Sequence, residues 1–114
     1  MKIAILNCLK ANDVCTGEAC LTALRERSGA FSAYRCRDAE LAAFLRCNGC
    51  GGDPERDPGM LEKLDRLRAI GTDTLHLGVC TVLDGAECPT ITKLAEMAEK
   101  RGIRVVRGTH ASRP

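Results

Sequence analysis

The chain has 114 residues, a formal net charge of +2 and a pI near 8.2. This length suits one domain with a modest core. Basic and acidic residues are interleaved rather than gathered in blocks, so the charge pattern favours neither nucleic acid nor an acidic membrane surface as a partner. With no Trp, one Tyr and two Phe, the core is predicted to be aliphatic.

The segment Met1 to Asn7 has too short an apolar run for a signal peptide. No stretch approaches the roughly 18 apolar residues that a membrane helix needs. We therefore expect a cytoplasmic protein with no membrane partner. Eight cysteines in a reducing compartment are poor candidates for a disulfide framework and favour metal, cluster or redox chemistry.

Apolar runs and helical stripes alternate along the chain. Lys2 to Asn7 is predicted to form a short buried strand. A helix is expected from about Glu18, with Gly29 as the residue that stops it. The segment Phe31 to Asp38 fits neither pattern. Leu41 to Arg46 is predicted to be the second strand.

After a loop rich in Gly and Pro, apolar residues at helical spacing and a Glu62–Arg66 pair predict a second helix, which Gly71 ends. A third strand is expected at Thr74 to Val79, followed by a turn at Asp84-Gly85. The apolar residues of the second helix are Met60, Leu61, Leu64 and Leu67.

The last helix is expected to begin at Pro89, which suits the first helical position, and to end at Gly102. Ile103 to Arg107 is the fourth predicted strand. Strands that alternate with helices predict a single α/β domain over residues 1–110, with residues 111–114 as a C-terminal tail. We expect a four-stranded parallel sheet in the order 2-1-3-4 with helices on both faces, a Rossmann-like or flavodoxin-like three-layer fold.

Two thiols three positions apart, Cys47 and Cys50, lie in the loop Cys47-Asn48-Gly49-Cys50-Gly51-Gly52. That spacing suits one metal ion or one redox pair. The glycines permit positive φ and let backbone amides point at thiolate charge.

Most of the other candidate ligands fall at the same predicted edge of the sheet. Some of them directly follow a predicted strand, and the others lie in loops that lead from this edge into a helix. Because open α/β sheets bind ligands at the carboxyl ends of their strands, we expect these residues to converge there as metal ligands. The full set is Cys8, Cys15, Cys20, Cys47, Cys50, Cys80, Cys88 and His110.

Two further residues are expected to lie outside the ligand set. Cys36 does not follow the pattern and is interpreted as a free structural thiol. His76 lies inside the third predicted strand, which favours a core or edge histidine over one that orients a ligand.

These motifs together make the sequence similar to the CGGC domain proteins, over nearly the whole chain. One departure is visible, because the family's C-G-G-C reads Cys47-Asn48-Gly49-Cys50 here. The resemblance implies metal binding by the cysteines and a histidine, and it supplies no reaction. The motifs that carry it are a strand ending at Cys8, Cys15-Thr-Gly-Glu-Ala-Cys20, Phe31, the central loop, His76 with Cys80, Cys88-Pro89 and Gly108-Thr109-His110.

Zinc takes four thiolate or imidazole ligands, which Cys47, Cys50 and Cys80 with His110 or Cys8 could provide. Eight candidate ligands exceed one such site, so two metals or an iron–sulfur cluster also fit. Either the metal serves a reaction, or the protein is a metal carrier, sensor or store.

Two other chemistries use the central loop. Cys47 and Cys50 could form a dithiol redox pair with a small-molecule or thiol partner, although such pairs usually cap a helix directly. Cys50 and Arg56 have the C-x5-R spacing of a cysteine phosphatase or arsenate reductase. Asp53 and Glu55 would repel the oxyanion in that loop, and Pro54 removes an amide donor.

Overall fold

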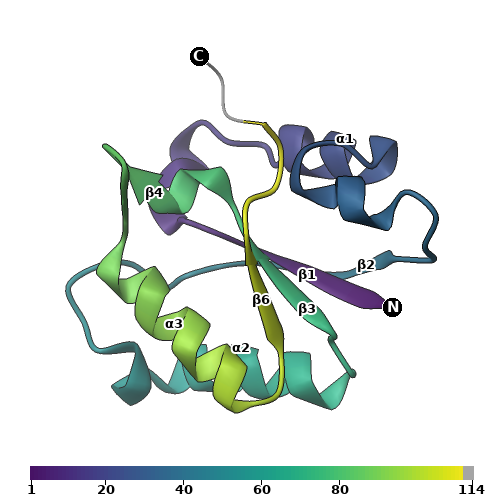
Figure 1. Cartoon of the computed structure of the whole chain (residues 1–114). Helices are drawn as coiled ribbons and strands as arrows, with labels where there is room; N and C mark the ends of the chain where they lie inside the picture. Colours follow the sequence, from purple (N-terminus) through teal and green to yellow (C-terminus); the bar gives the residue numbers. More distant parts are fainter. Residues whose placement is uncertain (112–114) are drawn as a thin grey trace.

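The predicted parallel sheet is present in the computed structural model, which describes residues 1–111; residues 112–114 of the predicted tail lie outside the described residues. Its strands follow the order β2-β1-β3-β6, which is the predicted 2-1-3-4 order (Figure 1). All three pairings are parallel. The strands are β1 (Lys2–Asn7), β2 (Glu40–Arg46), β3 (Thr74–Leu77) and β6 (Arg104–Arg107).

Helices cover both faces of this sheet, as predicted (Figure 1). Helices α2 (Pro58–Ala69) and α3 (Pro89–Lys100) pack on one face, and α1 (Glu18–Glu26) with the 3-10 helix η2 (Gly29–Tyr34) packs on the other. Successive side chains of a strand point to opposite faces, so β1 contributes to both cores. Ala4 and Leu6 join the core beneath α2 and α3, and Ile3 and Ile5 join the core beneath α1.

Helix α2 begins at Pro58, two residues before Met60, which is the first apolar residue of the predicted helix. It begins there because Asp57 caps it. The Asp57 carboxylate accepts hydrogen bonds from the amides of Gly59 and Met60, at 2.9 and 3.3 Å. Pro58 occupies the first turn, where its missing N–H costs nothing. The predicted pair of Glu62 and Arg66 is present at 3.0 Å.

The predicted stop of α1 at Gly29 is wrong. The helix ends at Glu26, and Arg27 adopts the left-handed conformation with φ of 55°. The Arg27 side chain stabilises this ending, because its guanidinium donates to the carbonyls of Leu24 and Ala39 at 2.7 and 3.0 Å.

Strand β3 ends two residues earlier than predicted, at Leu77. Residues Val79–Thr81 form the short 3-10 helix η4 instead. The predicted turn at Asp84-Gly85 joins two strands that were not predicted, β4 (Val82–Leu83) and β5 (Ala86–Glu87), which pair antiparallel. In residues 1–111, no helix has the length and apolar character required to cross a membrane.

His76 is a core histidine, as the sequence favoured. It is fully buried in β3 and packs against Phe31, with ring centroids 4.5 Å apart. The Gly108 carbonyl can only accept, so Nδ1–H donates to it at 2.9 Å, and Nε2 accepts from the Tyr34 hydroxyl at 2.7 Å. Burial lowers the pKa of His76, which keeps the imidazole neutral in the folded chain.

Replacing Tyr34 with Phe should destabilise the fold without changing its shape. The Tyr34→Phe variant leaves His76 Nε2 buried without its donor, which typically costs about 1–3 kcal/mol. Urea unfolding of the variant and of the unaltered chain measures this loss. Ser32→Ala, which removes an exposed hydroxyl from the same η2, is the control and should change stability little. Equal losses in both variants would contradict the assigned role of Tyr34.

Candidate functional site

The carboxyl ends of the sheet strands lie level with one another. Leu6 of β1 pairs with Leu45 of β2 and with Leu77 of β3, and Leu77 pairs with Arg107 of β6. The chain passes from β1 outward to β2 and then returns to β3 on the other side of β1. Open α/β sheets bind ligands at such a reversal of strand order, so the gap beyond β1 and β3 is the expected position for a site.

The turn that follows β1 holds two sulfurs from the neighbouring strands. The Cys8 amide donates to Cys80 Sγ at 3.2 Å, and the Leu9 amide donates to Cys47 Sγ at 3.4 Å. Consecutive amide nitrogens are at most about 3.7 Å apart, so these two sulfurs lie within about 10 Å of each other. The turn after β1 is therefore hydrogen-bonded to one thiol beyond the end of β2 and to one beyond the end of β3.

Asn7, the last residue of β1, lies beside these thiols and was not singled out from the sequence. Its side chain is 1% exposed, and Oδ1 has no hydrogen-bond partner within residues 1–111. A side chain at Gly78 would collide with Asn7 Oδ1 and would crowd Cys80 Sγ. Gly78 therefore provides the space that lets Asn7 and Cys80 occupy the strand-order reversal.

Two more cysteines lie on the α1 side of this turn. Cys20 is buried in the first turn of α1, and its thiol donates to Thr109 Oγ1 at 3.2 Å. Cys15 Sγ accepts the Gly17 amide at 3.3 Å. Burial raises the pKa of Cys80, and the nearby charges of Cys8, Cys20 and Cys15 raise it further. We refer to Cys8, Cys15, Cys20, Cys47 and Cys80 as the switch-point thiols.

His110 lies on the α1 side of the edge rather than beside the central loop. It lines a small hollow together with Cys15, Gly17 and Glu18, and its Nδ1 is 2.9 Å from the Ala111 carbonyl. The sequence predicted that His110 lies beside Cys47 and Cys50, but these contacts place it beside Cys15 instead.

Cys50 and Cys88 form a separate pair on the α3 side. Cys50 is exposed, and Cys88 is half-buried directly before α3. The neighbouring Cys88 thiol is the main reason why the pKa of Cys50 is raised. Burial opposes ionisation of Cys88, but the amides of Ile91 and Thr90 outweigh it and lower the pKa of Cys88.

The candidate ligands lie at one edge of the sheet, but their side chains are not arranged to coordinate one metal ion. Among residues 1–111, no three His, Cys, Asp or Glu side chains are placed so that they could hold one metal ion. The predicted tetrahedron of Cys47, Cys50 and Cys80 with His110 or Cys8 is therefore not preformed. The physical reason is that Cys47 turns to the Leu9 amide while Cys50 turns to Cys88.

The central loop uses its unusual Asn as a brace. Asn48 does not need the left-handed conformation, which falls to Gly49 at φ of 107°. The Asn48 amide group donates to Asp57 Oδ2 at 3.2 Å, and Asn48 Oδ1 accepts from Lys63 Nζ at 2.7 Å. The departure from C-G-G-C thus ties the loop to the start of α2.

The C-x5-R segment is not shaped as an oxyanion cradle. Arg56 is exposed, and its Nε lies 3.8 Å from the Asp53 carboxylate. The Glu55 amide donates to Asp53 Oδ1 and the Arg56 amide to the Asp53 carbonyl, at 3.0 and 2.9 Å. Because these amides are occupied and the pKa of Cys50 is raised rather than lowered, the phosphatase and arsenate reductase interpretations lose their support.

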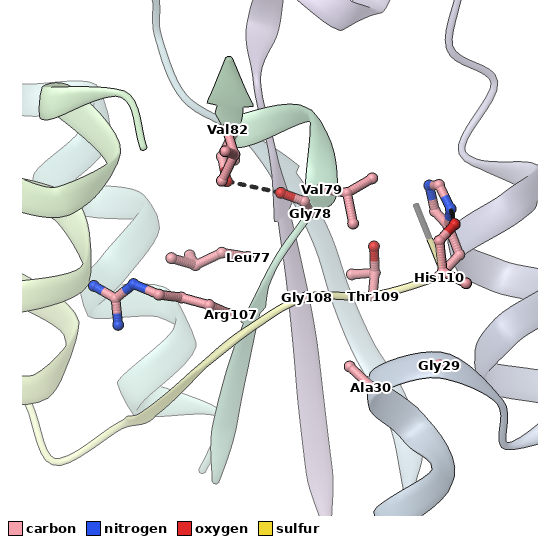
Figure 2. Close-up of a pocket in the computed structure, with 12 residues that line it drawn as sticks. Gly29, Ala30, Leu77, Gly78, Val79, Val82, Arg107, Gly108, Thr109 and His110 are labelled. Carbon is pink, nitrogen blue, oxygen red and sulfur yellow. Dashed lines mark hydrogen bonds between the residues drawn. The ribbon is translucent and has the colours of Figure 1, made fainter. Parts of the chain in front are cut away.

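A cavity of about 350 Å³ lies at the same edge of the sheet (Figure 2). It lies beyond the ends of β3 and β6, where Leu77 and Gly78 form one wall and Gly108 with Thr109 forms another. Thr109, which accepts the Cys20 thiol, connects this cavity to the thiols. Its one arginine, Arg107, is paired with Glu87 at 2.8 Å.

Cys36 lies outside both thiol groups, as predicted. It is exposed and precedes Asp38, whose carbonyl accepts the N-terminal amine at 3.1 Å. That contact places Cys36 near the amino end of β1, at the opposite edge of the sheet. Cys36 is therefore a matched control for any experiment on the other seven cysteines.

Comparison with known proteins finds the same family that the sequence motifs resemble, and the match covers nearly the whole chain. The family model described as "CGGC domain" matches residues 2–110. An uncharacterized protein of Methanocaldococcus jannaschii is 37% identical over 118 residues, which cover 96% of this chain and 87% of the relative. Among solved structures, none matches significantly.

Changing Asn48 to Gly restores the C-G-G-C motif and should raise the pKa of Asp57. The hydrogen bond from Asn48 is the main cause that holds the pKa of Asp57 below its ordinary value. NMR titration of the Asp57 carboxyl in Asn48→Gly should give a midpoint closer to that of a free aspartate. Lys63→Met, which removes a weaker influence on Asp57, should shift the midpoint less. An unchanged midpoint in Asn48→Gly would show that the brace is not formed.

Proposed function

The chain belongs to the CGGC domain family, and on that basis we propose that it is a metal-binding protein whose ligands are cysteines at the carboxyl edge of the sheet. The ligand set that we propose is narrower than the sequence suggested. It comprises the switch-point thiols, with His110 as an additional donor beside Cys15. Cys50 and Cys88 are left out because each thiol has the other as a neighbour on the α3 side of the edge.

The observation that supports this proposal most strongly is the electrostatic coupling around Cys80. Burial raises the pKa of Cys80, the hydrogen bond from the Cys8 amide lowers it, and the charges of Cys8, Cys20 and Cys15 raise it, so that the net direction disfavours a thiolate at this position. Four thiolates would repel one another strongly in so small a volume. A bound cation removes this repulsion, and four sulfur donors is the number that a tetrahedral zinc site or a [4Fe–4S] cluster requires.

Backbone amides directed at sulfur give a second line of support. The amides of Cys8, Leu9 and Gly17 donate to Cys80, Cys47 and Cys15 respectively. Such bonds stabilise sulfur charge whether or not a metal is bound, and they tune the properties of bound clusters. The donor chemistry therefore fits zinc or an iron–sulfur cluster, and binding requires the thiols to rotate inward from their present partners.

A bound zinc ion would lock the strand ends together or act as a Lewis acid, and a cluster would carry electrons. The chain itself contributes the remaining features of the site. Asn7 Oδ1 provides an acceptor beside the thiols that no group within residues 1–111 occupies. The cavity next to Thr109 provides room for a small molecule.

Metal content tests the proposal. Protein purified without oxygen should contain zinc, or iron together with acid-labile sulfide, and elemental analysis with a sulfide assay measures both. Cys80→Ser should lose most of this metal because it removes the sulfur at the centre of the coupled group. Cys36→Ser should keep the metal content of the unaltered chain, since Cys36 lies at the opposite edge.

Two results would contradict metal binding by these residues. One is a chain that remains free of metal after reconstitution with zinc and with iron and sulfide. The other is equal metal content in Cys80→Ser and Cys36→Ser. Circular dichroism of both variants shows whether Cys80→Ser still folds, so a loss of metal is not confused with a loss of structure.

A further inference from the structure

The central loop and the start of α3 lie side by side. Lys93 of α3 forms an ion pair with Glu55 at 3.4 Å. A small groove of about 190 Å³ runs between the loop and the helix, and both Cys50 and Thr90 line it. This contact brings Cys50 near Cys88, which is 38 positions away in the chain, and each thiol is among the causes of the other's pKa shift.

The two thiols of this pair are chemically unequal. Cys88 directly precedes α3. Burial raises the pKa of Cys88, but the free amides of Ile91 and Thr90 at the start of the helix outweigh it, so that this pKa is lowered. The pKa of Cys50 is raised instead, and Cys88 is the main cause. One activated sulfur beside one protonated, exposed sulfur is the pattern of an attacking and a resolving cysteine.

Cys47, the other candidate partner of Cys50, is placed differently. Its side chain is 2% exposed and belongs to the hydrophobic core beneath α2 and α3. Its sulfur accepts the Leu9 amide. A sulfur that is buried and held in this way is inaccessible to a dissolved disulfide.

We propose that Cys50 and Cys88 form a reversible dithiol–disulfide couple that exchanges with low-molecular-weight disulfides. The groove lined by Cys50 and Thr90 gives a small molecule access to Cys50. Cys88, two residues before Thr90, is itself partly exposed. The couple is distinct from the metal-binding residues proposed above.

The exchange proceeds in two balanced steps. The Cys88 thiolate attacks one sulfur of the disulfide RSSR, forming a Cys88–SR mixed disulfide and releasing RS⁻. Cys50 then loses its proton to solvent and attacks Cys88 Sγ, forming the Cys50–Cys88 disulfide and releasing the second RS⁻. The protein dithiol is oxidised by two electrons, and RSSR is reduced to two thiols. Excess RSH reverses both steps.

The geometry makes closure of this bond feasible. The two thiols are near enough to shift each other's pKa, and a disulfide requires the sulfurs to approach to about 2.05 Å. Cys50 is exposed and lies between Gly49 and Gly51, both in positive-φ conformations. The neighbouring glycines leave the Cys50 side chain unhindered on the loop side.

Peptide mapping tests the couple directly. The full-length protein is incubated with oxidised glutathione, alkylated and cleaved after glutamate, which separates residues 41–55 from residues 88–96. Mass spectrometry should find these two peptides joined by a disulfide that reduced glutathione removes. At pH 7, iodoacetamide should alkylate Cys88 of the reduced protein faster than Cys50, because the pKa of Cys88 is lowered and that of Cys50 is raised.

Matched variants assign the bond. The cross-link should persist in Cys47→Ser, which leaves Cys50 in the same peptide, and should vanish in Cys50→Ser. It should also persist in Cys80→Ser, so the couple can be confirmed even if metal binding fails. A Cys47–Cys50 disulfide, a cross-link that survives in Cys50→Ser, or free thiols at both positions after oxidation would overturn the proposal.

Discussion

Hydrogen bonds from two consecutive amides hold the functional edge of this protein together. The Cys8 and Leu9 amides directly follow strand β1. They donate to the sulfurs of Cys80 and Cys47, which follow the neighbouring strands β3 and β2. Parallel strands end at a common edge without assistance, but their side chains are free to point elsewhere. Here the turn after β1 draws Cys80 and Cys47 toward the point where the strand order reverses. Gly78 is needed for this, because any side chain there would displace Asn7 and Cys80.

Much of the fold could be predicted because local patterns determine it. The alternation of strands and helices gave the sheet order, and Pro89 marked the start of α3. The errors come from features that local patterns do not encode. Val82 and Leu83 make a strand only through pairing with Ala86 and Glu87. Arg27 ends α1 because its side chain reaches Ala39, a contact that depends on tertiary structure.

The candidate site could be predicted in position but not in detail. Strand ends placed the cysteines at one edge, and the parallel register supports that placement. The spacing of Cys47 and Cys50 suggested a pair, yet tertiary contacts direct these sulfurs to Leu9 and Cys88 instead. Spacing describes only what neighbours along the chain can reach. We therefore propose that the seven thiols at this edge divide into a metal-binding group at the sheet and a redox couple at α3.

X-ray absorption spectroscopy of the metal-loaded protein tests the central claim most directly, because it counts the sulfur neighbours of the metal. We predict that sulfur atoms at about 2.3 Å dominate the first coordination shell. Their number should fall in Cys80→Ser and stay constant in Cys50→Ser, which removes a thiol that we place outside the metal site. A first shell of only oxygen or nitrogen neighbours, or a sulfur count that falls in Cys50→Ser but not in Cys80→Ser, would contradict the account.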